Sequence, residues 1–246
     1  MQNNAPADAL KDLAPSGKLR AAINFGNTVL AQKDPSSGEP RGISADLAHE
    51  LARRLGVPIT FAAFDTAGKA FDAVKAAECD IGFLANEPAR AAEIAFTAPY
   101  VVIEGAYMIR SDSPLRTVAE VDREGVRIAV GNKAAYDLYL TRTLKHAELV
   151  RAPSSAAAME LFLKEGLDAA AGVRQPLVTF AAAHPGLRVM EERFMAIEQA
   201  MCMPQGRAAG ARYLRAFVEE MKASGFVADG LERSGQGDAM VAPASG

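Results

Sequence analysis

The chain has 246 residues, half of them hydrophobic, and its 27 basic residues stand against 30 acidic ones for a formal net charge of −3. At about 150 residues per domain, this length suits one large domain or two small ones. No apolar stretch reaches the roughly 18 residues that span a bilayer, and no run of lysine and arginine marks a polyanion-binding surface. Composition therefore argues against a membrane-spanning protein and against general nucleic-acid binding.

The first half of the chain alternates between short β-rich runs and helical segments, which is typical of an α/β protein with largely parallel strands. Ser44 is the predicted N-cap of a helix that carries leucines at four-residue spacing and ends at Gly56. A second helix is predicted around residues 69–77. Strands are predicted at 19–24, 58–64 and 80–85.

The same order of elements returns after Gly125. Asp80 and Asp168 each follow a helix and a turn, and each opens an apolar strand. The agreement favours two similar lobes, although an alanine-rich sequence can also produce such a match by chance. The predicted elements are strands at 126–130, 148–151 and 168–173 and helices at 135–144 and 155–164.

Two segments are predicted to cross between the lobes. Residues 94–110 form a long apolar run without helical punctuation, and strands at 187–197 and 199–203 precede an amphipathic helix at 207–224. The predicted fold class is thus α/β with two lobes, each a mostly parallel sheet flanked by helices. Lobe 1 comprises residues 1–109 plus 198–246, with flexible tails, and lobe 2 is the insertion 110–197. Two chain crossings between the lobes predict a hinge, and a hinge between two lobes predicts a ligand-binding cleft.

Ligands of open parallel sheets bind beyond the carboxyl ends of the strands. One such loop contains Asn86 and Pro88 at a predicted first helical turn, followed by Arg90. An arginine beside a helix N-terminus suits a carboxylate, because its parallel N–H donors match the two oxygens. The alternative is a solvated Arg90 paired with Glu87 or Glu93.

A second strand-to-helix turn offers backbone N–H groups and the cation of Lys133, with Ala134 and Ala135 following. Lys133 is otherwise an ordinary surface lysine. Arg174 follows the strand that ends at Val173 and is either a third cationic group of the site or a solvent-facing residue.

No motif for metal or cofactor chemistry is present. The three histidines lie far apart without metal-ligand spacing, and the chain lacks a nucleophile elbow and a phosphate loop. We therefore predict no catalytic residue, no metal and no cofactor.

Cys79 and Cys202 either form a disulfide, in an exported protein, or stay as two buried thiols. The N-terminus shows no export signal, which suits a cytosolic start or the trimmed end of a mature exported protein.

Several segments together carry a family resemblance over about residues 17–235. They are GKLRAAIN, GISADLAHELARRLGVPITF (42–61), AVKAAECDIGF (73–83), PARAAEIAFTAPYV (88–101), VRIAVG (126–131) and AFVEEMKASGFVADGLERSG. In order and spacing the chain resembles the bacterial extracellular solute-binding proteins of family 3, the periplasmic components of polar amino-acid ABC transporters, with the two-lobed type II periplasmic-binding-protein fold.

The resemblance implies a monomeric periplasmic protein, its signal peptide removed, that closes like a Venus flytrap on a small carboxylate-bearing solute. The solute would be an amino acid or a related organic acid, delivered to a membrane permease without chemistry. It also implies that Arg90 binds the ligand's carboxylate. A cyclohexadienyl-dehydratase-like enzyme and a ligand-sensing domain on the same fold are the alternatives.

The ligand-contacting positions can be carried over one by one, and they include departures from the family pattern. Where the family usually has an aromatic stretch after the first strand, this chain has the residues around Asn27. Where the family usually has a turn with hydroxyl side chains, this chain has Lys133-Ala134-Ala135. Val173 occupies the position at which the family commonly carries the acid that pairs with the ligand's α-ammonium group. Either Glu104 or Asp65 takes that role, or the ligand lacks an α-amino group, which we favour. The predicted ligand-binding residues are Asn27, Ala85, Asn86, Arg90, Glu104, Lys133, Ala134, Ala135, Val173 and Arg174.

Overall fold

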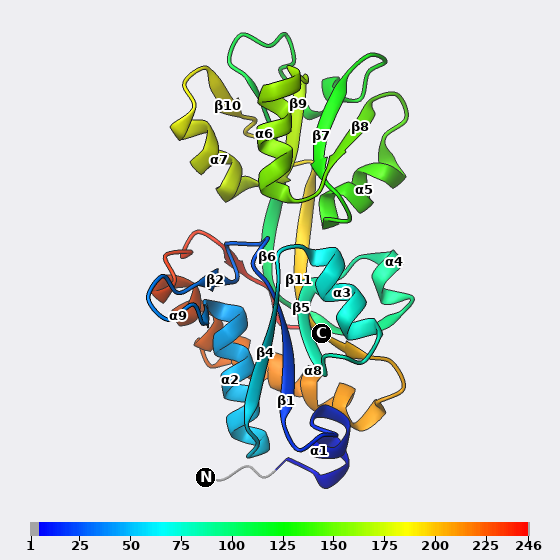
Figure 1. The fold of residues 1–246 in the computed structure, drawn as a ribbon, viewed down its shortest axis with the longest axis vertical. Coiled ribbons are helices and arrows are strands. Elements are labelled where there is room, and N and C mark those ends of the chain that lie inside the picture. Colours follow the sequence, from blue (N-terminus) through cyan, green and yellow to red (C-terminus); the bar gives the residue numbers. More distant parts are fainter. Residues whose placement is uncertain (1–4, 246) are drawn as a thin grey trace. The chain divides into compact units, whose positions relative to one another are not determined.

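The computed structural model describes residues 5–245 (Figure 1). The chain divides into two compact units: unit 1 holds the described residues up to Val102 and from Glu198 onward, and unit 2 is Ile103–Ile197. Relative to the predicted lobes, the first boundary lies at Val102 rather than at residue 109. Each unit is a mixed α/β body, which confirms the predicted fold class.

Unit 1 is built on three parallel strands in the order β4-β1-β5, with β11 antiparallel beside β5. Helices α2 and α3 pack against β1. Strand β1 has the predicted bounds, and the other two parallel strands begin one residue later than predicted. The elements are β1 (Leu19–Asn24), α2 (Ile43–Leu55), β4 (Ile59–Phe64), α3 (Ala67–Lys75), β5 (Ile81–Ala85) and β11 (Met195–Pro204).

Unit 2 repeats this plan, with parallel strands in the order β8-β7-β9 and β6 antiparallel beside β9. The same neighbour order in both units confirms the predicted internal likeness. A short strand, β10, pairs with the end of β6. The elements are β6 (Ile94–Arg110), a 3₁₀ turn (Val118–Val121), β7 (Arg127–Gly131), α5 (Ala135–Thr143), β8 (Glu148–Ala152), α6 (Ser155–Glu165), β9 (Ala169–Val173), α7 (Arg174–Ala183) and β10 (Leu187–Val189).

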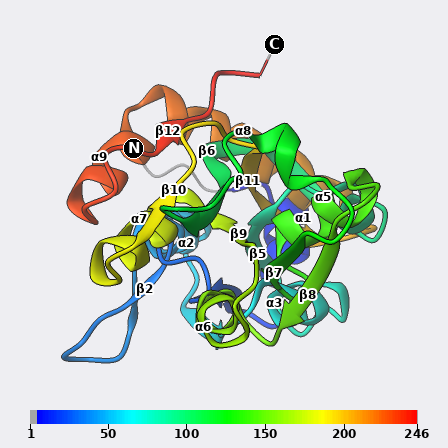
Figure 2. The ribbon, with the colours of Figure 1, turned by 90° about the horizontal axis from the view of Figure 1, so that it is seen from above.

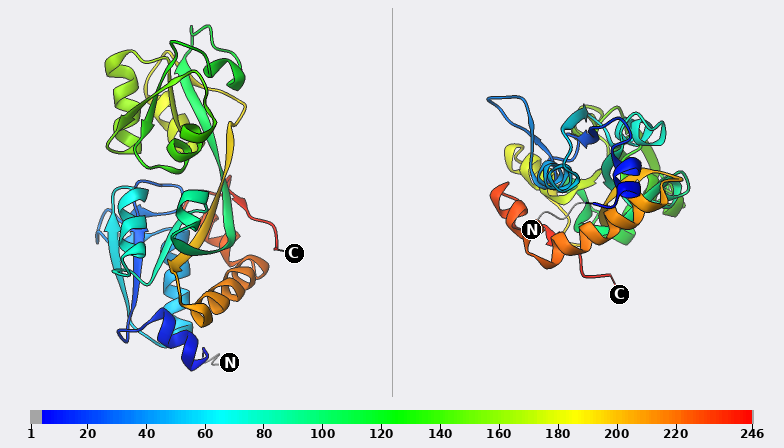
Figure 3. Two further views of the ribbon diagram at one scale, coloured as in Figure 1. Left: turned by 90° about the vertical axis from the view of Figure 1, so that its right-hand side faces the viewer. Right: turned by 90° about the horizontal axis from the view of Figure 1, so that it is seen from below.

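The first and last helices and strands of the described chain pack on unit 1. Helix α1 (Ala7–Leu13) buries Leu13 and lies beside α8 (Ala208–Ala223), as Figure 3 shows in blue and orange. Helix α9 (Phe226–Arg233) follows α8, and β12 (Met240–Val241) pairs with β6.

Two predictions about elements need correction, and one helix is additional. Ser44 does not cap α2, because the cap is Gly42 at φ 100°, and the Ser44 hydroxyl lies 3.2 Å from the Tyr100 hydroxyl instead. The strand predicted at 187–197 is two strands, β10 and the start of β11, with a loop between them. Helix α7 was not predicted at all.

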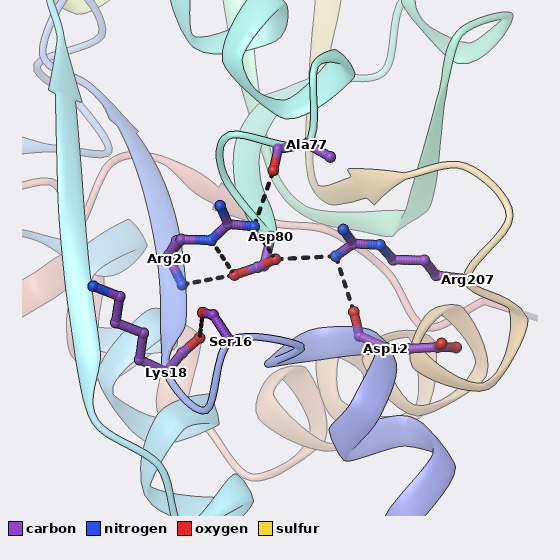
Figure 4. Close-up of polar contacts among 7 residues, drawn as sticks. All are labelled: Asp12, Ser16, Lys18, Arg20, Ala77, Asp80 and Arg207. Atoms are coloured by element: carbon purple, nitrogen blue, oxygen red, sulfur yellow. Dashed lines mark hydrogen bonds and ion pairs between the residues drawn. The ribbon is translucent and has the colours of Figure 1, made fainter.

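Equivalent aspartates join the first and third parallel strands of both units. The Asp80 amide donates to the Arg20 carbonyl, and the Arg20 amide donates to the Asp80 carboxylate; Asp168 and Arg127 repeat both bonds. Only Asp80 is buried. Its carboxylate also receives two bonds from the Arg20 guanidinium and one from Arg207, which in turn donates to the Asp12 carbonyl (Figure 4).

Two smaller features complete unit 1. The hairpin of β2 (Gln32–Lys33) and β3 (Pro40–Arg41) carries a loop that projects away from the other elements of this unit (Figure 2). Cys79 and Cys202 are free thiols, both buried in one hydrophobic cluster. The alternative of two buried thiols is therefore the one that the structure shows.

Candidate functional site

Each unit has one edge where its parallel strands end, and the predicted ligand-binding loops start there. In unit 1 the strands β1, β4 and β5 end at Asn24, Phe64 and Ala85. In unit 2 the strands β7, β8 and β9 end at Gly131, Ala152 and Val173. We call these the carboxyl edges of unit 1 and of unit 2.

Arg90 lies on the carboxyl edge of unit 1, within the short helix α4 (Pro88–Ala91). Pro88 occupies the first helical position, as predicted, since a proline loses no helical hydrogen bond there. The Arg90 side chain turns inward: the residue is only 3 % exposed, and one guanidinium N–H donates to the Ala85 carbonyl at 3.3 Å. Burial lowers the pKa of Arg90, and the neighbouring Cys202 and Glu87 oppose that shift.

The other predicted residues of unit 1 surround this loop and the loop after β1. Ala85 is buried and pairs with Gln199 of β11, whereas Asn86 is exposed and its amide donates to the Glu198 carbonyl. Asn27 is half-buried, and its side-chain oxygen is buried without a hydrogen-bond partner.

The carboxyl edge of unit 2 places Lys133, Ala134 and Ala135 in one tight turn. Lys133 is exposed and has a positive φ of 58°, and its amide donates to the buried Asp137 carboxylate at 2.8 Å. Gly131 is required before the turn, because a Cβ there would lie 2.8 Å from the Ser155 amide nitrogen.

Two helices at this edge begin without a side-chain cap. Ala134 is the N-cap of α5 and Val173 is the N-cap of α7, and neither side chain can accept a hydrogen bond. Helix α6 differs, since the Ser154 hydroxyl accepts from the Ala157 amide. The first turns of α5 and α7 therefore direct backbone N–H groups and the positive ends of their dipoles toward the edge. Such ends favour a bound anion.

Glu104 and Arg174 contact each other in unit 2. The Arg174 Nε donates to Glu104 at 2.6 Å, and its two terminal nitrogens donate to the Met190 and Glu191 carbonyls. The other Glu104 oxygen accepts from Arg193 at 3.3 Å. Arg174 thus joins the start of α7 to β6 and to the loop before β11, so its donors are engaged within unit 2.

Asp65, the second acid considered for an ammonium group, is also paired. It lies on the carboxyl edge of unit 1 in an exposed ion pair of 2.8 Å with Lys69, which holds the pKa of Asp65 below its usual range.

Two further residues lie at the edges that the sequence did not indicate as site residues. Gln175, in the first turn of α7, has a buried side-chain oxygen without a partner. Gly26 allows the loop after β1 to approach the Asp65 carbonyl, which would lie 2.5 Å from a Cβ, and the Asn24 side chain accepts from the Gly26 amide. An asparagine two residues before a glycine at a strand end is the signal that indicates such a turn.

A pocket of about 590 Å³ in unit 2 lies away from these residues. It is lined by the end of β6, by α6 and by the turn between α7 and β10, including Arg110 and His184. Met108 of β6 pairs with Ala170 near the start of β9, so the pocket lies toward the amino ends of the parallel strands. It contains none of the predicted site residues.

Within residues 5–245, no cluster of three or more histidine, cysteine, aspartate or glutamate side chains is arranged to hold a metal ion. In the same part of the chain, every helix is too short or too polar to cross a bilayer.

Residues 30–233 match the bacterial extracellular solute-binding proteins, family 3, and the chain belongs to this family. The resemblance read from the sequence is thus confirmed. No protein with a curated description matches the chain.

Solved structures share the fold at low identity. A mutant of ArgBP from T. maritima is 22 % identical, with a TM-score of 0.77 over 92 % of this chain and 98 % of that one. The solute receptor for L-cysteine of Neisseria gonorrhoeae is 18 % identical, with a TM-score of 0.78 over 93 % of each chain. An ancestral amino-acid-binding protein, a precursor of cyclohexadienyl dehydratase, is 20 % identical, with a TM-score of 0.75 over 92 % and 98 %.

Proposed function

We propose that this protein is the periplasmic binding component of an ABC importer. It captures one small carboxylate-bearing solute, an amino acid or a related organic acid, between its two units and delivers it to a membrane permease. It acts as a monomer, without cofactor and without chemistry. Family membership supports the solute-binding role, and the chemistry at the two carboxyl edges supports the carboxylate.

The observation that carries the proposal is the position of Arg90. Arg90 lies on the carboxyl edge of unit 1, beside the end of β5, where open parallel sheets bind their ligands. A carboxylate suits an arginine at this edge, because a carboxylate can accept two parallel bonds from a guanidinium. In unit 2, the uncapped helices α5 and α7 offer backbone N–H donors that suit an anion.

An enzyme on this scaffold is the second candidate, because one fold relative is a precursor of cyclohexadienyl dehydratase. Such a dehydratase needs a general acid beside its substrate. Val173 occupies the position where the family resemblance would place such an acid, and its side chain cannot donate a proton. The nearby Glu104 forms ion pairs with Arg174 and Arg193. We therefore propose binding without turnover. Consumption of prephenate or arogenate by the purified protein would establish the enzyme instead.

A thermal-shift screen tests the binding proposal. Amino acids, hydroxy acids, keto acids and dicarboxylates are added at millimolar concentration. A ligand at one hundred times its Kd adds about 2.7 kcal/mol, which corresponds to a rise in Tm of roughly 5–10 °C for a chain of this size.

The screen is repeated on Arg90→Ala, on Arg90→Lys, which keeps the charge but not the paired donors, and on the matched control Arg215→Ala. Arg215 is exposed on α8. The two Arg90 variants are expected to lose the shift and the control to keep it. A shift that survives both Arg90 changes, or no shift with any compound, would refute the proposal.

A further inference from the structure

The pocket at the end of β6 in unit 2 holds about 590 Å³, within the roughly 300–1,000 Å³ of small-molecule sites. We infer that this pocket is a second binding site, for a small zwitterion with an apolar body such as an apolar α-amino acid. All of its lining residues belong to unit 2, and it lies toward the amino ends of the parallel strands. The inference therefore goes beyond the proposed function and does not depend on it.

Two opposite charges line the pocket without pairing. Arg110 and Asp112 both contribute to its wall, and in the described part of the chain neither side chain forms a hydrogen bond or an ion pair. The Arg110 guanidinium lies instead over the ring of the buried Phe162, 5.6 Å from the ring centroid, so its N–H donors stay available. A ligand that carries both charges can satisfy Arg110 and Asp112 at once.

Two neutral side chains of the pocket add matching hydrogen-bonding groups. The His184 ring stacks on Phe180 at 4.0 Å, and its Nδ1 lies 2.8 Å from the Phe180 carbonyl oxygen. Because a carbonyl only accepts, Nδ1 carries the hydrogen, and Nε2 of the neutral ring is an acceptor. His184 and Asp112 thus offer acceptors to an ammonium group. Arg110 and the Ser111 hydroxyl offer donors to a carboxylate.

Backbone bonds and apolar side chains form the rest of the pocket. Leu187 pairs with Arg110 where β10 meets β6, and the Ser111 amide donates to the Gly186 carbonyl at 2.8 Å. Leu163 and Leu187 are half-buried and pack against the hydrophobic core of unit 2. An apolar ligand body placed against them removes further apolar surface from water, which favours a zwitterion with a hydrocarbon side chain.

Leucine is the probe for this site, and two compounds with the same apolar body each lack one of its charges. Isoamylamine lacks the carboxylate, and isocaproate lacks the ammonium group. Each compound is titrated into isotope-labelled protein, and the amide NMR signals of Ser111, His184 and Gly186 report binding at the pocket itself. Leucine is expected to shift these signals to saturation and to bind about fivefold more tightly than either analogue. That ratio corresponds to about 1 kcal/mol, the upper range for an exposed charge contact.

Charge-removing variants test the same inference from the protein side. Arg110→Gln and Asp112→Asn are each expected to weaken leucine binding at the pocket by about fivefold. Arg116→Gln and Glu124→Gln are the matched controls, because both residues are exposed in unit 2 and do not line the pocket. Arg90→Ala is expected to leave the signal shifts at the pocket unchanged, since Arg90 belongs to unit 1.

Several results would overturn the inference. They are the absence of a saturable shift with leucine, equal binding of an analogue with a single charge, and shifts that keep their full affinity in both Arg110→Gln and Asp112→Asn. Shifts that disappear in Arg90→Ala would also overturn it, because they would then arise from the proposed solute site. The thermal-shift screen of the Arg90 variants tests the proposed function separately, so the two can fail independently.

Discussion

Two aspartates with the same backbone role differ in the charge around them. Asp80 is fully buried with two arginines, whereas Asp168 is exposed. Replacing Asp80 by asparagine keeps the shape but leaves the Arg20 and Arg207 charges uncompensated. We expect Asp80→Asn to lower the free energy of unfolding by about 3–5 kcal/mol.

Asp168→Asn is the matched control, because it alters the equivalent position of unit 2 while keeping an oxygen for the Arg127 amide. Its expected cost is below about 1 kcal/mol. Urea denaturation of both variants measures the difference. Equal losses would show that the buried ion pairs contribute nothing beyond the shared backbone bonds.

The two thiols make stability depend on alkaline pH. Burial raises the pKa of Cys79 to about 11 and that of Cys202 to about 12, against roughly 8.5 in an unfolded chain. The unfolded chain therefore loses its thiol protons first as pH rises. The stabilisation is complete below about pH 8.5 and declines as the pH rises toward the folded-state values.

Urea midpoints at pH 7.5, 8.5 and 9.5 follow this decline below the unfolded-state pKa of tyrosine, which is about 10. A variant with both Cys79→Ala and Cys202→Ala is expected to show a shallower decline than the wild-type protein. An identical slope in the two proteins would assign the pH dependence to other groups.

At the scale of elements, the contact between α1 and α8 depends on Gly210. A Cβ at this position would lie 2.8 Å from Asp12 Cβ and 2.9 Å from Met203 Cε. We expect Gly210→Ala to separate α1 from α8 and to lower the free energy of unfolding by about 1–3 kcal/mol.

Gly237→Ala is the control for this change, because its nearest contact is an ordinary 3.7 Å to Glu232 Cγ. Thermal unfolding of the two variants compares them. If Gly210→Ala unfolds at the same temperature as the wild-type protein, the close helix contact is not tight in solution.

Most elements could be predicted from the sequence because hydrophobic periodicity and capping residues mark them. The run that forms β6 and the glycine that ends α2 are such cases. Helix α7 was missed because Pro176 interrupts its first turn, although proline is tolerated there. Ser44 was assigned as a cap because the sequence does not reveal that Gly42 takes a φ that only glycine adopts readily.

The candidate site was less predictable than the fold. A cation after a strand indicated Arg90, but its inward direction depends on burial and on its bond to the Ala85 carbonyl of β5. The pairing of Arg174 with Glu104 joins residues 70 positions apart, and no local pattern predicts it. The unpartnered oxygen of Gln175 likewise arises from burial by neighbouring elements, which a sequence does not display.

At the scale of the whole molecule, the chain passes between its units twice, within β6 and within β11, and each unit repeats the same order of parallel strands. As proposed, these two connections act as the hinge of the protein. If one solute engages groups of both units, as proposed, binding must favour a closed arrangement over an open one.

Small-angle X-ray scattering of the purified protein, with and without the solute that gives the largest thermal shift, tests this central claim most directly. The radius of gyration is expected to fall when wild-type protein is saturated, and to stay at its ligand-free value when Arg90→Ala is mixed with the same solute. A saturated wild-type protein whose radius of gyration does not change would contradict the account.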